Sequence, residues 1–141
     1  MNAVKPRVLV VEDNPMNLEL VSDLLQAKGF AVHHAPTAEQ GLILARSLMP
    51  DLILMDVSLP GLDGLQATKA LRAYPATRNL TIVALTAHAM RGDEELALKA
   101  GCDGYLAKPI DTRSFADRIT GFIAAANARR AQTQPDQSHG N

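Results

Sequence analysis

The residues that could do chemistry follow or end short apolar runs. Glu12 and Asp13 follow the first run, Asp56 the third, Thr86 the fourth and Lys108 the fifth. If these runs are parallel strands, their carboxyl ends meet at one edge of a sheet, where ligands bind. Three carboxylates there would repel one another and raise at least one pKa unless a cation is present, and Mg²⁺ prefers such oxygen ligands. With a hydroxyl and an amine added, the set suits a phosphoryl group beside Mg²⁺, and Asp56 is the candidate nucleophile that forms an aspartyl phosphate.

Strands and helices that could position these side chains alternate along the chain. Short apolar runs predict buried strands, and apolar residues at helical spacing predict the helices between them. Asn14 followed by Pro15 predicts one helix start, and Thr37 with Gln40 predicts another. The predicted strands cover about 8–11, 31–35, 52–56, 82–86 and 104–107, and the predicted helices about 15–28, 37–48, 64–73, from between 89 and 93 to 101, and from 111 or 112 onwards.

This alternation predicts an α/β fold with helices on both faces of a parallel sheet. We expect a flavodoxin-like (βα)5 three-layer sandwich with the strand order 2-1-3-4-5. In that order Glu12, Asp13 and Asp56 reach one crevice between the first and third strands. The apolar pattern alone does not fix the order, so the meeting of the carboxylates is a prediction that depends on it.

Length, charge and cysteine content exclude several other classes. The 141 residues fit one domain, and the net charge of −1 gives no general attraction for nucleic acid or membranes. No apolar run approaches the ~20 residues of a membrane span. Cys102 is the single cysteine, so an intrachain disulfide is excluded and a cytoplasmic location is expected. We expect one domain over residues 1–127 and a disordered tail over 128–141, where the apolar period ends.

The residues in these positions form a pattern that resembles a known family. The chain resembles the receiver domain of two-component response regulators over about residues 5–125. The elements that carry the resemblance are Glu12-Asp13, Asp56, Thr86-Ala87, Tyr105 and Lys108-Pro109.

The resemblance implies a role for each of these residues. Asp56 would accept a phosphoryl group from a phosphohistidine, and Mg²⁺ would be held by Asp13, by Asp56, by Glu12 through water and by the carbonyl of Ser58. Thr86, Ala87 and Lys108 would stabilise the phosphoryl group. Thr86 and Tyr105 would act as a switch, although Tyr105 taken alone is read equally well as a core aromatic residue. The peptide bond before Pro109 would be cis.

Within this family the chain is most similar to the stand-alone DivK-type receivers of bacterial cell-cycle control. The matching stretches are 11–14, 51–56 and 89–95. Two positions depart from the pattern, with Ser58 two residues after Asp56 and His88 two residues after Thr86. Both positions influence how fast the acyl phosphate hydrolyses in receivers. His88 could overhang the phosphoryl group or face solvent at the rim.

Three alternatives remain open. The chain could be a phosphotransfer intermediate for a hybrid kinase. A haloacid-dehalogenase-type phosphatase also uses an aspartate nucleophile, but its general-acid aspartate would occupy the position of Ser58. A flavodoxin-like FMN binder would need a phosphate loop where Glu12 and Asp13 would repel a phosphate.

The resemblance also implies the partners. A histidine kinase or a histidine phosphotransfer protein would supply the phosphoryl group, and the chain would be a signalling domain that catalyses only its own phosphorylation and dephosphorylation. No second domain follows the last predicted helix, so we expect the output to be a protein contact. That contact would use the face formed by the fourth helix, the fifth strand and the fifth helix.

Overall fold

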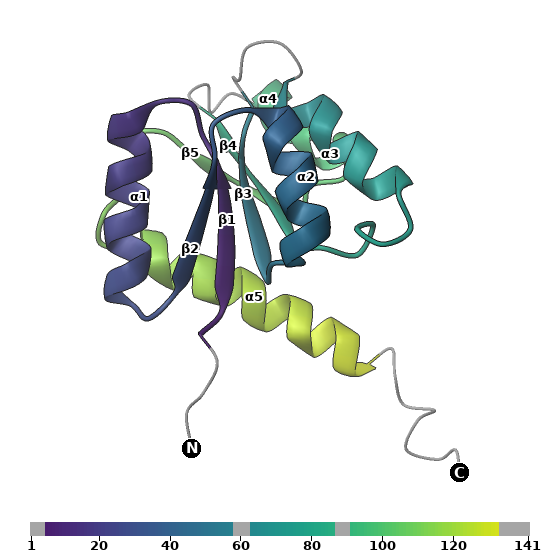
Figure 1. The fold of residues 1–141 in the computed structure, drawn as a ribbon. Helices are drawn as coiled ribbons and strands as arrows, with labels where there is room; N and C mark the ends of the chain where they lie inside the picture. The colour runs from purple at the N-terminus through teal and green to yellow at the C-terminus, as the bar shows by residue number, and fades with distance from the viewer. Residues whose placement is uncertain (1–4, 58–62, 87–90, 133–141) are drawn as a thin grey trace.

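The computed structural model describes residues 5–57, 63–86 and 91–132. Within them five strands alternate with five helices (Figure 1). The strands are β1 (Arg7–Val11), β2 (Ala31–Ala35), β3 (Leu52–Asp56), β4 (Ile82–Thr86) and β5 (Gly104–Ala107). The helices are α1 (Pro15–Ala27), α2 (Ala38–Leu48), α3 (Gly64–Ala73), α4 (Arg91–Ala100) and α5 (Phe115–Gln132).

The five strands form one parallel sheet in the order β2-β1-β3-β4-β5. This confirms the predicted flavodoxin-like fold. Because alternate side chains of a strand point to opposite faces, β1 contributes to two cores. Val8 and Val10 pack with residues of α1 and α5, whereas Leu9 and Val11 pack with residues of α2, α3 and α4. The fold therefore has three layers, as Figure 1 shows.

Local side-chain chemistry starts three of the helices. Asn14 Oδ1 accepts hydrogen bonds from the backbone N–H groups of Met16 and Asn17, which caps α1. Thr37 Oγ1 does the same for α2, and Asp63 Oδ1 for α3. The caps at Asn14 and Thr37 lie within three residues of the ends of β1 and β2, so α1 and α2 start close to the edge where these strands end.

The last helix differs from its prediction at both ends. It begins at Phe115, because residues 112–114 form a turn in which Asp111 Oδ1 accepts from Arg113 N–H. It continues to Gln132, so the expectation of a disordered tail from residue 128 is wrong for 128–132. Alanine, arginine and glutamine in this stretch favour a helix without an apolar period. Residues 133–141 of the predicted tail lie outside the described residues.

Candidate functional site

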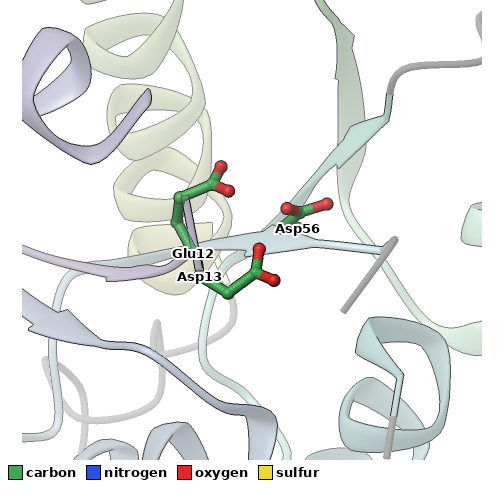
Figure 2. Close-up of side chains that lie close together, drawn as sticks. All are labelled: Glu12, Asp13 and Asp56. Atoms are coloured by element: carbon green, nitrogen blue, oxygen red, sulfur yellow. The ribbon is translucent and has the colours of Figure 1, made fainter. Parts of the chain in front are cut away.

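Three carboxylates meet at the carboxyl edge of β1 and β3 (Figure 2). Glu12 and Asp13 directly follow β1, and Asp56 is the last residue of β3. The register pairs Val11 with Met55, which brings Glu12 beside Asp56 one residue further along. One carboxylate oxygen from each residue lies within 4.8 Å of the others. Glu12 and Asp56 are buried and Asp13 is exposed, so the cluster opens to solvent on the Asp13 side.

Lys108 directly follows β5 and reaches this cluster along the same edge of the sheet. Its Nζ lies 3.1 Å from Asp56 Oδ2 and 3.4 Å from Glu12 Oε1. The backbone N–H of Lys108 donates to the carbonyl of Thr86, which ties the residue to the end of β4. The Lys108–Pro109 peptide bond is cis, as the resemblance implied. One ammonium group is thus shared between two buried carboxylates.

The charges at this edge do not balance, and the pKa of Glu12 reflects this. Burial raises that pKa, and the neighbouring carboxyl of Asp56 raises it further. The N–H of Asn14 and the charge of Lys108 act in the opposite direction, and the result is a pKa of about 7. Burial lowers the pKa of Lys108, but its bonds to Asp56 and Glu12 outweigh burial and raise the pKa above its usual value. An added cation would relieve this excess of negative charge.

The donor set fits a hard divalent cation. Glu12 Oε1 is buried, and among the described residues it is matched by the 3.4 Å ion pair with Lys108 Nζ rather than by a hydrogen bond. The exposed carboxylate of Asp13 and the buried one of Asp56 supply further oxygen atoms beside it. Oxygen atoms from carboxylates are the ligands that Mg²⁺ takes in proteins. The residues present could therefore hold Mg²⁺.

The remaining predicted site residues divide into two groups. Thr86 ends β4, is 4% exposed and pairs with Ala107 of β5, so it lies at the same edge as Asp56. Tyr105 lies on β5, half-buried against the core on the side of α2, α3 and α4. Ser58, Ala87 and His88 lie outside the described residues, so their roles stay predictions.

One contact at the site was missed from the sequence. His34 of β2 has its ring Nε2 3.0 Å from the carbonyl oxygen of Glu12. The backbone N–H of Glu12 donates to the carbonyl of Ala35. Both contacts hold the backbone of Glu12 against the end of β2. The sequence feature that could have indicated this contact is the position of His34 near the end of β2, the strand adjacent to β1.

Comparison with known proteins agrees with this geometry. The family model of the response regulator receiver domain matches residues 8–120. The polar-differentiation response regulator DivK of Brucella ovis is 40% identical over 119 residues, which cover 84% of this chain and 97% of that protein.

Solved structures of receivers have the same fold. The receiver domain of the sensor histidine kinase PA1611 of Pseudomonas aeruginosa is 37% identical, with a TM-score of 0.79 over 86% of this chain and 99% of that one. It has a magnesium ion coordinated in its active-site cleft. A response regulator structure from Chloroflexus aurantiacus is 30% identical, with a TM-score of 0.82 over 86% of this chain and 99% of that one.

These matches give no support to the phosphatase alternative. The match to the family model, residues 8–120, includes the acidic cluster, Thr86 and Lys108. Receiver domains are signalling domains that bind Mg²⁺ at an acidic site, and Glu12, Asp13 and Asp56 form an acidic cluster in this chain. The chain belongs to the family of response regulator receiver domains.

Proposed function

We propose that Asp56 accepts a phosphoryl group from the phosphohistidine of a histidine kinase or a histidine phosphotransfer protein. The observation that carries this proposal is the placement of Asp56. Its carboxylate is 2% exposed, lies within 4.8 Å of two other carboxylates and contacts the ammonium group of Lys108. A structural aspartate would not require two further acids beside it.

The proposed reaction is an in-line displacement at phosphorus. An electron pair of the Asp56 carboxylate forms the O–P bond, and the electron pair of the breaking P–N bond stays on the imidazole of the donor. Lys108 then donates to a phosphoryl oxygen in place of its bond to Asp56, and the hydroxyl of Thr86 and the N–H of Ala87 donate to others. Asp13, Asp56, the Ser58 carbonyl and, through water, Glu12 would hold Mg²⁺, which would neutralise negative charge at the phosphoryl group.

The proposed output is a change in a protein-binding face. Thr86 and Tyr105 lie on neighbouring strands, and both are expected to reposition when the phosphoryl group recruits the Thr86 hydroxyl. The adjacent helix α4 exposes the apolar side chains of Leu96 (54%) and Leu98 (47%). Apolar side chains exposed on one helix suit a contact with a protein target.

Two cellular roles have specific support. Identity of 40% over 97% of the length of DivK favours a DivK-type regulator in a phosphorelay, and a role in cell-cycle control is part of this proposal. Identity of 37% to the receiver of a sensor histidine kinase favours the second role, a phosphotransfer intermediate for a hybrid kinase. Either role is exercised in the cytoplasm. No helix within 5–57, 63–86 and 91–132 is long and apolar enough to cross a membrane.

Transfer of labelled phosphate tests the proposal. The wild-type chain, in Mg²⁺, should take up label from a small acyl-phosphate donor and from phosphorylated histidine kinases of its own genome. Asp56→Asn should take up none, because an amide oxygen is a poor nucleophile. The control Asp23→Asn alters an exposed acid on α1 and should label from the small donor at the wild-type rate. Labelling of Asp56→Asn at the wild-type rate would refute the assignment.

The same preparation separates the two roles. A phosphotransfer intermediate should pass its label to a second histidine phosphotransfer protein within the time of the assay. A DivK-type regulator should instead bind a target protein more tightly in its labelled form.

A further inference from the structure

His34 lies next to the acidic cluster but has no part in the proposed phosphorylation. It is on the edge strand β2, one residue before that strand ends at Ala35. Its ring Nε2 is 3.0 Å from the carbonyl oxygen of Glu12, although the residue is exposed. A carbonyl oxygen only accepts hydrogen bonds, so Nε2 is the protonated ring nitrogen and donates. A side chain of an edge strand is thus bonded to the backbone of the site.

This bond takes the place of a backbone bond that the end of β2 removes. The N–H of Glu12 donates to the carbonyl of Ala35, as in a regular parallel ladder. In such a ladder the carbonyl of Glu12 would accept next from the N–H two residues after Ala35, at Thr37. β2 ends at Ala35, and Thr37 is instead the N-cap of α2. Among the described residues, the ring of His34 supplies the donor that the carbonyl of Glu12 would otherwise lack.

The bond from His34 restrains the peptide group that joins two residues of the acidic cluster. The carbonyl of Glu12 and the N–H of Asp13 belong to one planar unit, so a donor on the carbonyl restrains the rotation of the whole unit. One residue further along, the N–H of Asn14 donates to Glu12 Oε2 at 3.2 Å. The two bonds hold the backbone on both sides of Asp13.

The side chain of Asp13 depends on this backbone for its position. It is exposed, and within residues 5–57, 63–86 and 91–132 no hydrogen bond or ion pair holds its carboxylate. The carboxylates of Glu12 and Asp56 repel it, since one oxygen atom of each of the three residues lies within 4.8 Å of the others (Figure 2). A restrained backbone keeps Asp13 beside these two acids before any cation is bound.

We propose that His34 is a positioning residue that raises the affinity of the acidic cluster for Mg²⁺ by holding Asp13 in place. The inference rests on the proposed function, in which Asp13 is a direct ligand of Mg²⁺. A ligand that is already in place loses less conformational freedom when the ion binds. Loss of a residue that orients metal ligands typically weakens metal binding about 10–100-fold. Because His34 is exposed and acts through the backbone, we expect the lower end of this range.

Calorimetric titration of the full chain with Mg²⁺ at pH 8 tests the role of His34. His34→Ala removes the donor and should raise the dissociation constant for Mg²⁺ about tenfold. His34→Gln supplies an amide N–H donor in its side chain and should restore most of the affinity. His33→Ala is the matched control, because His33 is the neighbouring residue of β2 and its side chain points to the opposite face of the sheet. It should change the dissociation constant less than about twofold.

The dependence of labelling on Mg²⁺ separates a positioning role from a general loss of structure. In His34→Ala the Mg²⁺ concentration that gives half of the maximal labelling rate should rise about tenfold. The maximal rate should stay near that of the wild type, because Asp56 and Lys108 are unchanged. A variant that is only destabilised would instead lose labelling rate at every Mg²⁺ concentration, and that result would overturn the proposal.

The calorimetric results can also overturn it. Equal dissociation constants for the wild type and His34→Ala would show that the bond to Glu12 does not act on the metal site. An equal loss of affinity in His33→Ala, or no recovery in His34→Gln, would assign the effect to the strand edge and not to the donor. A wild type that does not bind Mg²⁺ would overturn this proposal together with the proposed metal site. Labelling of Asp56→Asn at the wild-type rate would refute the phosphoacceptor alone and would leave the calorimetric result for His34 standing.

Discussion

Lys108 Nζ lies 3.1 Å from Asp56 Oδ2, although Asp56 ends β3, Lys108 follows β5 and β4 lies between these two strands. The same nitrogen lies 3.4 Å from Glu12 Oε1. Both carboxylates are buried, and the side chain of Lys108 is only 18% exposed. The ammonium group therefore acts as the counter-charge for two buried acids before any metal or phosphoryl group is bound.

Replacement of Lys108 by alanine should destabilise the metal-free protein. The variant leaves Glu12 and Asp56 without their cation, and breaking a buried ion pair by removing one partner costs about 3–5 kcal/mol. Urea unfolding at pH 8 in EDTA measures this loss, and phosphate labelling of Asp56 should also be slower. The control Lys69→Ala removes an exposed lysine of α3 and should change the free energy of unfolding by less than about 0.5 kcal/mol. Identical urea midpoints for all three proteins would show that Lys108 is not the counter-charge.

Loss of the acidic side chains should weaken Mg²⁺ binding. Asp13→Asn and Glu12→Gln each remove one negative charge from the cluster, and each should raise the dissociation constant for Mg²⁺ by about tenfold, with a larger effect in the double variant. Calorimetric titration with Mg²⁺ gives the constants. Glu39→Gln, an exposed acid of α2, is the control and should bind Mg²⁺ as the wild type does. An unchanged affinity in the double variant would place the metal elsewhere.

The raised pKa of Glu12 predicts a pH dependence of stability in the metal-free protein. The pKa is 4.5 for an ordinary glutamate and about 7 in the folded chain, so between these values the folded state holds the proton more tightly than the unfolded state. The contribution of Glu12 is fully present below pH 4.5 and is lost as the pH rises through 7. The free energy of unfolding of the wild type, minus that of Glu12→Gln, should therefore fall across this window.

Urea unfolding of both proteins in EDTA at several pH values gives this difference directly. Subtraction of the Glu12→Gln curve removes the contributions of the other carboxyl groups. A difference that stays flat, or rises with pH, would contradict the raised pKa.

Much of this site could be predicted because most of its residues lie at the ends of strands, and the ends of strands can be read from the apolar runs. Asp56 and Thr86 end apolar runs, and Glu12 directly follows one, so parallel pairing alone brings them to one edge. The start of α1 was equally predictable, since Asn14 and Pro15 form a local cap that requires no tertiary contact. The strand order was the one further assumption, and the observed sheet confirms it.

Features that depend on tertiary contacts could not be predicted in this way. The contact of His34 with the carbonyl of Glu12 follows from the pairing register of β1 and β2, which the apolar pattern of a half-buried edge strand does not fix. The start of α5 at Phe115 depends on how Asp111 bonds to the turn before it.

Gly64 is another such residue, and it gives the last prediction. It is the first residue of α3, and a Cβ there would meet the carbonyl oxygen of Asp56 and come within 2.9 Å of Met55 Cγ. The backbone of the proposed phosphoacceptor would have to move to accept even a methyl group. Overpacking of this kind costs about 1–3 kcal/mol. Gly64→Ala should therefore lower the urea midpoint and slow the labelling of Asp56.

Gly121 provides the matched control. It lies on α5, and a Cβ there would meet nothing within 4 Å. The same Gly→Ala change should stabilise the protein by about 0.5–1 kcal/mol, because alanine loses less conformational entropy in a helix. The two variants should thus shift the urea midpoint in opposite directions, with wild-type labelling in Gly121→Ala only. A stabilised Gly64→Ala that labels at the wild-type rate would mean that α3 can move away from β3 without displacing Asp56.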